Sequence, residues 1–220
     1  KAEKLIALEI DRGLVELLRH LFQSFKQVEI LACDVLELSW FRLFADHFPG
    51  DGPLKLISNL PYVISGPFMY SLFRNRFPFT RAVLMFQKEV AERLTAGAGD
   101  PNYGALSVLS AYYCRGEILF AVGNNVFWPR PKVGSSVLLL QPREPLLSPA
   151  EEAHFSEMVQ GLFRQRRKTL LNNMISYYNM ERQTALMLLE KAGLSGAERP
   201  ENIRVEQFAM LARINYNYHK

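Results

Sequence analysis

Residues 54–62 read "LKLISNLPY", a short apolar run that closes on an asparagine and a proline–tyrosine pair. A run of this length with turn residues behind it predicts a buried strand over residues 54–59, followed by a turn. Asparagine and proline are common turn residues, so an ordinary turn is one interpretation. The other interpretation is a strand end shaped to hold a flat ring that carries an amine.

Strand-like runs alternate with helix-like segments through the first part of the chain. This alternation predicts an α/β fold in which helices cover both faces of a parallel sheet. The strand-like runs are residues 5–11, 28–34, 54–59 and 81–87, and the helix-like segments are residues 14–22, 68–73 and 88–96.

The pattern changes after residue 100. Residues 105–114 fit a helix or a strand equally well. Residues 116–122 and 135–142 read as two strands with no long helix between them, which favours an antiparallel pair at the edge of the sheet.

The last third of the chain is predicted to be helical. Residues 141–149 have the composition of a linker. Ser148 suits a helix N-cap, and Gly193 suits a C-cap. We therefore predict two domains, an α/β domain over residues 1–145 and a small helical domain over residues 146–220. The expected helices of the second domain are residues 150–163, 183–192 and 205–214.

Composition limits the class of protein. Of 220 residues, 49% are hydrophobic and 22% are charged, which is typical of a globular chain. No apolar run approaches the roughly 18–20 residues that cross a bilayer, so we expect no membrane partner. The cysteines, Cys33 and Cys114, do not make a disulfide framework. The four histidines are scattered, so we predict no metal site.

Positive charge is concentrated at one place. The net charge is only +4, but residues 164–168 read "RQRRK", with four cationic side chains in five positions. Such a run is equally compatible with a solvated helix face and with a nucleic-acid contact.

Polar residues follow three consecutive strands of the predicted sheet. Glu9 and Asp11 follow the first run, Asp34 the second and Asn59 the third. In open parallel sheets, ligands bind beyond the carboxyl ends of the strands. Each of these residues could instead cap a helix or a turn. Together they favour an adenosine-containing cofactor, because carboxylates accept hydrogen bonds from ribose hydroxyls and from an adenine amine. That cofactor could be a dinucleotide or S-adenosylmethionine.

The residues after the third strand favour methyl transfer to an adenine amine. The lone pair of that amine is delocalised into the ring, so the amine is a poor nucleophile. The Asn59 side-chain oxygen and the Leu60 carbonyl can accept its N–H groups and localise the lone pair. Pro61 stiffens the loop, and Tyr62 can stack on a base that has left its helix. No strong general base is required, because the methylated amine becomes acidic.

Eight segments, in order from residue 7 to residue 208, carry a resemblance to one family. They read "ALEIDR", "CDVLEL", "NLPYVISGPF", "MFQKEVAERL", "PNYGALSV", "FWPRPKVGSSV", "FRQRRKTLLNN" and "RPENIRVEQF". The chain resembles the ribosomal RNA small-subunit adenine dimethyltransferases (the KsgA/RsmA group). The resemblance implies a Rossmann-like, S-adenosylmethionine-dependent methyltransferase sheet with a small C-terminal helical domain. It also implies N6,N6-dimethylation of two adjacent adenines in small-subunit (16S) ribosomal RNA, with a role in biogenesis of the small subunit.

The resemblance also implies roles for individual residues. The cofactor would be held by Glu9, Ile10, Asp34 and Val35, with Asn59 between cofactor and target. Catalysis would rest on Asn59, Leu60 and Pro61, while Tyr62 and Phe127 sandwich the target adenine. The RNA-binding residues would be Arg130, Lys132, Arg164, Arg166, Arg167 and Lys168. The implied partner is small-subunit ribosomal RNA or the immature small subunit, bound by a monomer in a bacterial cytoplasm.

Two other functions remain open from the sequence. One is the related large-subunit adenine methyltransferase that confers macrolide resistance, although "PKVGSSV" and "RRKTLLNN" favour the small-subunit enzyme. The other is a non-catalytic RNA-binding assembly factor. A nicotinamide dehydrogenase is disfavoured, because no glycine fingerprint lies near the first strand.

The chain departs from the family at its start. The family begins with a "GQNFL"-like segment, a strand and a glycine-rich loop around the methionine end of the cofactor. This chain begins where the second strand is expected. We therefore expect at least about 30 further residues in the natural protein. We also expect the strands ending at Asp11 and Asn59 to lack a neighbour, and these 220 residues to bind the cofactor weakly or not at all.

Overall fold

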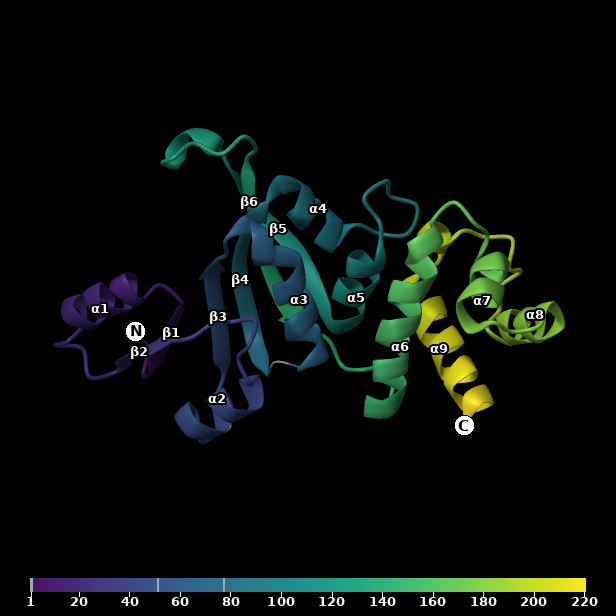
Figure 1. The fold of residues 1–220 in the computed structure, drawn as a ribbon, viewed down its shortest axis with the longest axis horizontal. Helices are drawn as coiled ribbons and strands as arrows, with labels where there is room; N and C mark the ends of the chain where they lie inside the picture. The colour runs from purple at the N-terminus through teal and green to yellow at the C-terminus, as the bar shows by residue number, and fades with distance from the viewer. Residues whose placement is uncertain (1, 51, 77) are drawn as a thin grey trace. The chain divides into compact units, whose positions relative to one another are not determined.

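The computed structural model describes residues 2–50, 52–76 and 78–220. The chain forms two compact units (Figure 1). The first unit comprises Lys1–Pro53 and Pro67–Phe77, and the second comprises Leu54–Gly66 and Pro78–Lys220. The predicted domain boundary at residue 145 lies inside the second unit. A division of that unit into a sheet-containing part and a helical part stays a prediction.

The first unit is built on a parallel strand pair. Strands β1 (Leu5–Glu9) and β2 (Val28–Ala32) are in register from Leu5 beside Val28 to Glu9 beside Ala32. Helix α1 (Arg12–Leu21) connects them and buries Val15. Asp11 caps this helix, because its Oδ1 accepts a hydrogen bond from the Leu14 amide at 2.9 Å.

Two further helices contribute to the first unit. Helix α2 (Trp40–His47) was not expected from the sequence, and Ser39 caps it. Helix α3 (Ser65–Arg74) belongs to this unit from Pro67 onward. The buried indole of Trp40 joins the two helices: its N–H donates to Ser71 Oγ at 3.4 Å, and its ring meets Phe68 edge-on.

The second unit contains a four-stranded sheet in the order β3-β4-β6-β5. Strands β3 (Leu54–Asn59) and β4 (Phe79–Gln87) are parallel. Strand β6 (Ser135–Pro142) runs antiparallel to both β4 and β5 (Cys114–Val122). The predicted antiparallel pair at the sheet edge is therefore confirmed.

The alternating pattern predicted one parallel sheet, but the described strands form two separate sheets. Among the described residues, β1 pairs only with β2, and β3 pairs only with β4. This agrees with the expectation that the strands ending at Asp11 and Asn59 each lack a neighbour.

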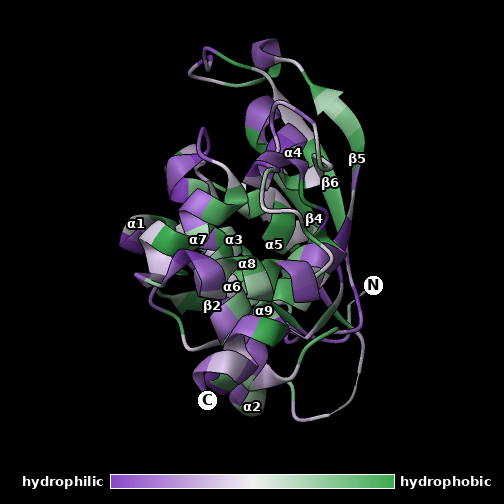
Figure 2. Ribbon diagram, turned by 90° about the vertical axis from the view of Figure 1, so that its right-hand side faces the viewer, coloured by the Kyte–Doolittle hydropathy of each residue, from purple (hydrophilic) through white to green (hydrophobic). Residues whose placement is uncertain are grey.

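The core of the second unit follows the two-residue period of its central strands. Leu84 and Phe86 of β4 and Leu138 and Leu140 of β6 are fully buried. Helix α4 (Lys88–Thr95) packs on β4, β5 and β6, and helix α5 (Ala105–Tyr113) packs on β5. The segment that fitted helix or strand is thus a helix. Figure 2 shows hydrophobic residues in the carboxyl-terminal part of β5, where Ile118, Leu119 and Phe120 remain exposed.

The C-terminal part of the second unit is helical. Its helices are α6 (Pro149–Leu162), α7 (Leu170–Tyr178), α8 (Arg182–Lys191) and α9 (Val205–His219). Ser148 caps α6 in a reciprocal arrangement with Glu151, and Gly193 adopts a positive φ of 69° behind α8, as predicted. Helix α7 was not expected. Short 3-10 turns cover Tyr62–Ile64, Asn124–Val126, Phe163–Gln165 and Pro200–Asn202.

Helix α5 fastens this helical part to the sheet. The buried Tyr112 hydroxyl donates to Glu152 Oε1 of α6 at 3.0 Å and accepts from the Leu147 amide at 3.1 Å. Within the described part of the chain, no helix is both long enough and apolar enough to cross a membrane.

Candidate active site

The register of the four-stranded sheet places two predicted site segments at the same end of the strands, the carboxyl end of β3 and β4. Asn59 lies beside Met85, and Gln87 lies beside Ser135. Since β3 and β4 end here and the antiparallel β6 begins here, the loops after Asn59 and before Ser135 leave the sheet from the same edge. The carboxyl ends of parallel strands are where ligands of such sheets bind.

Tyr62 is anchored at this edge. Its hydroxyl lies 2.8 Å from Ser135 Oγ, and Ser135 is only 1% exposed. Leu60 is buried, while Asn59 is exposed. The buried Leu60 side chain and the Tyr62 hydrogen bond therefore fix the loop and leave the Asn59 amide open to a ligand.

Residues 123–134 form a braced loop beside this segment. Asn124 Nδ2 donates to the Pro131 carbonyl at 3.3 Å, and Asn124 Oδ1 accepts from Arg130 at 2.9 Å. The Lys88 amide donates to the Gly134 carbonyl at 3.0 Å. Phe127 is half-buried in this loop. The sandwich of an adenine between Phe127 and Tyr62 stays a prediction.

The first unit holds the predicted cofactor residues at the carboxyl end of its strand pair. Glu9 Oε1 accepts from the amides of Ile10 at 2.8 Å and Asp11 at 2.9 Å. Asp34 Oδ1 accepts from the Leu36 amide at 2.8 Å. Each carboxylate is thus oriented through one oxygen, and a carboxylate has a second oxygen with which to accept.

The surroundings of these carboxylates fit an adenosine group. The Ile10 side chain is 65% exposed and offers apolar surface for an adenine ring. Val35 is half-buried next to Asp34. Burial, together with the nearby Asp34 charge, raises the pKa of the Cys33 thiol and so favours its protonated form.

All six predicted RNA-binding cations, Arg130, Lys132, Arg164, Arg166, Arg167 and Lys168, are exposed. Arg130 donates to Asn124 Oδ1 at 2.9 Å. Arg166 donates to the Tyr103 carbonyl at 2.8 Å and lies 3.5 Å from Glu201 Oε2. These bonds turn its guanidinium toward the protein and compete with the predicted phosphate contact.

The sequence did not predict two residues that contact the predicted site residues, Ser135 beside Tyr62 and Tyr103 beside Arg166. Ser135 anchors Tyr62, and the only local signal was its place directly after the "FWPRPKVG" segment. Tyr103 donates from its buried hydroxyl to the Ile203 carbonyl at 2.8 Å. Burial raises the pKa of Tyr103, so the hydroxyl remains a donor.

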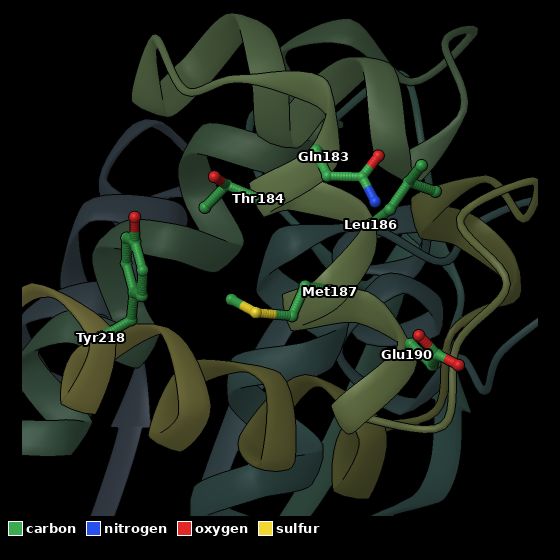
Figure 3. Close-up of a pocket in the computed structure, with 6 residues that line it drawn as sticks. All are labelled: Gln183, Thr184, Leu186, Met187, Glu190 and Tyr218. Atoms are coloured by element: carbon green, nitrogen blue, oxygen red, sulfur yellow. The ribbon is translucent and has the colours of Figure 1, made fainter.

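A hollow of about 370 Å³ lies elsewhere, between α8 and α9 (Figure 3). None of its lining residues is a predicted site residue. They are Gln183, Thr184, Leu186, Met187, Glu190 and Tyr218. Among the described residues, no cluster of histidine, cysteine and acidic side chains has the arrangement of a metal site.

The α/β fold with polar residues at the strand ends is that of a Rossmann-like methyltransferase. The family model "Ribosomal RNA adenine dimethylase" matches residues 1–216. The chain belongs to the ribosomal RNA adenine dimethylase family.

Relatives and solved structures agree with this assignment. The chain is 39% identical to "Ribosomal RNA small subunit methyltransferase A" of Alkaliphilus metalliredigens, over 97% of this chain and 75% of that protein. It is 37% identical to the protein of the same name from Halothermothrix orenii, over 96% of this chain and 71% of that protein. A dimethyladenosine transferase from Plasmodium falciparum superimposes with a TM-score of 0.78 at 25% identity, over 99% of this chain and 83% of that chain. The 23S rRNA methyltransferase ErmE shares the fold, with a TM-score of 0.67 at 23% identity over 97% of this chain and 82% of that chain.

Proposed function

We propose that this protein uses S-adenosylmethionine to dimethylate the N6 amines of two adjacent adenines in small-subunit ribosomal RNA. It would act on the immature small subunit, as a monomer in a bacterial cytoplasm. The observation that carries the proposal is the segment from Asn59 to Tyr62, which leaves the end of β3 and is tied by Tyr62 to Ser135. Methyl transfer to an amine requires hydrogen-bond acceptors at this segment. The dehydrogenases, which also bind an adenosine-containing cofactor, do not require them.

The cofactor would be held by residues of the first unit. Glu9 would take the ribose hydroxyls, and Asp34 would take the adenine amine, with Ile10 and Val35 against the ring. When bound, S-adenosylmethionine supplies an electrophilic methyl group. The backbone amides that hold one oxygen of each carboxylate reduce the ordering that binding requires.

The target adenine would be held by residues of the second unit. The Asn59 side-chain oxygen and the Leu60 carbonyl accept the two amine N–H groups and draw the nitrogen lone pair out of the ring. Tyr62 and Phe127 stack on the flipped base, and Pro61 restricts the backbone between the two acceptors and Tyr62. After each transfer the amine proton passes to solvent, because the methylated amine is strongly acidic.

A methyl-transfer assay tests this proposal. Labelled S-adenosylmethionine is supplied with immature small subunits, and the modified nucleotides are mapped. Asn59→Ala should lower the rate by about 100- to 1000-fold while RNA binding is retained, because a hydrogen-bond acceptor is lost at the reacting atom. Asn217→Ala, an exposed amide on α9, is the matched control and should leave the rate unchanged.

The alternatives predict different results. Modification of large-subunit RNA would indicate the macrolide-resistance type of enzyme. Tight RNA binding without methyl transfer, in the given chain and in an N-terminally extended one, would indicate an assembly factor.

A further inference from the structure

Trp128 is the most exposed large hydrophobic side chain among the described residues. It is 97% exposed and lies directly after Phe127 in the braced loop of residues 123–134. A single exposed apolar residue is common and needs no explanation by itself. An indole held outward on a rigid, basic loop beside a candidate active site is a different case.

The loop already holds the Trp128 indole in place, so the loop does not have to become ordered when a ligand binds. Prolines stand at positions 129 and 131, and Asn124 bridges the loop by bonding to both Arg130 and the Pro131 carbonyl. Both ends of the loop join paired strands, where Val122 lies beside Ser135. A rigid aromatic platform therefore loses little conformational entropy when it binds a ligand.

The charge around Trp128 selects the kind of ligand. Residues 123–134 contain Arg130 and Lys132 and no acidic residue, and both cations are exposed. Aromatic side chains flanked by cations bind single-stranded nucleic acid, because the ring stacks on a base and the cations attract the phosphates. A protein partner with an apolar surface would not require these cations.

The position of Trp128 relative to Phe127 selects which base it meets. Phe127 has extended backbone angles, φ −107° and ψ 147°, and consecutive side chains of an extended chain point in opposite directions. Phe127 is half-buried and Trp128 is exposed, as this alternation requires. Stacking of Phe127 on the target adenine therefore directs Trp128 away from the target and along the RNA strand.

We infer that Trp128 is an RNA-positioning residue that stacks on an unpaired base next to the target adenine. This inference rests on the proposed function for the identity of the target. Trp128 lowers the cost of holding the target strand open, because a base that has left its helix regains a stacking partner. Arg130 and Lys132 hold the adjoining phosphates.

Intrinsic fluorescence tests the inference directly, because the chain has two tryptophans. Trp40 is 2% exposed, so Trp40→Phe leaves Trp128 as the only reporter. A single-stranded RNA decamer with two adjacent adenines should quench the emission of this variant, and the same sequence as a duplex should not. Equal quenching by duplex and single strand, or no quenching by either, would overturn the inference.

Binding measurements on the otherwise native chain give an independent test. Trp128→Ala should weaken binding of the single-stranded decamer by about 5- to 150-fold, which is the usual range for loss of one stacked base. Trp128→Phe should recover most of the affinity. The loss should be the same at low and high salt, whereas Lys132→Ala should weaken binding more at low salt. Phe41→Ala, at an 83% exposed position on α2, is the control and should bind as the native chain does.

These measurements involve no methyl donor, so they separate the two proposals. Quenching together with the Trp128→Ala loss supports the stacking role even for a chain that transfers no methyl group. Unchanged binding by Trp128→Ala in a chain that methylates RNA overturns the stacking role alone.

Discussion

The hydrogen bond between Tyr62 and Ser135 predicts an asymmetric double-mutant cycle. Tyr62→Phe leaves Ser135 Oγ without its partner at a position that is 1% exposed, so it should lower the free energy of unfolding by about 1–3 kcal/mol. Ser135→Ala leaves the hydroxyl of half-buried Tyr62, which water can reach, so it should cost only about 0.5–1.5 kcal/mol.

The double variant removes both hydroxyls and leaves neither buried and unpaired. Its loss should therefore be smaller than the sum of the single losses, with a coupling of about 1 kcal/mol. Equilibrium urea unfolding of the four proteins, followed by far-UV circular dichroism, measures each free energy. The slope with denaturant should stay constant, since no large surface changes.

The control for this cycle is Tyr177→Phe. Tyr177 is 37% exposed and its hydroxyl donates to the Glu157 carbonyl at 3.3 Å, so its loss should change the free energy of unfolding by less than about 0.5 kcal/mol. Additive single losses, within about 0.3 kcal/mol, would refute the claim that Ser135 holds Tyr62 in place.

Three further predictions address other parts of the second unit. Arg166→Ala should lower the free energy of unfolding, because the Arg166 guanidinium hydrogen-bonds within the protein. Arg167→Ala should leave the free energy of unfolding unchanged and flatten the salt dependence of RNA binding. Equal effects of the two variants on either measurement would contradict a structural role for Arg166 and an RNA-binding role for Arg167. Gly196→Ala should cost about 1–3 kcal/mol, because φ is 81° and a Cβ would meet two leucines at 3.0 and 3.1 Å, whereas Gly97→Ala, with open space around it, should cost nothing measurable by the same urea titration. Burial lowers the pKa of His154 in the folded state, so the unfolded chain takes up the proton first as pH falls below about 6.5; stability should therefore fall in that range, and His154→Gln, compared at the same pH values, should flatten the dependence.

Local patterns predicted the elements of this fold where neighbouring residues decide them. The strands β1 to β4, the N-cap at Ser148 and the C-cap at Gly193 all follow from residues that are close together in the sequence. Helices α2 and α7 were missed.

The sequence by itself also determined the chemistry of the candidate site. Asparagine, leucine, proline and tyrosine after β3 predict acceptors and a stacking ring, because these side chains carry those properties in any fold. Polar residues at consecutive strand ends predict that Glu9, Asp34 and Asn59 converge, which stays a prediction. The register places Asn59 and the loop before Ser135 at the same end of the four-stranded sheet.

Only the tertiary structure decided which partner each side chain has. Ser135 is 73 positions from Tyr62, and the Tyr103 carbonyl is 63 positions from Arg166. No local rule spans such distances, since the pairing depends on the order β3-β4-β6-β5 and on the packing of α5 against the C-terminal helices. That packing places the Tyr103 carbonyl within hydrogen-bonding distance of the exposed Arg166, and the sheet order places Ser135 beside Tyr62.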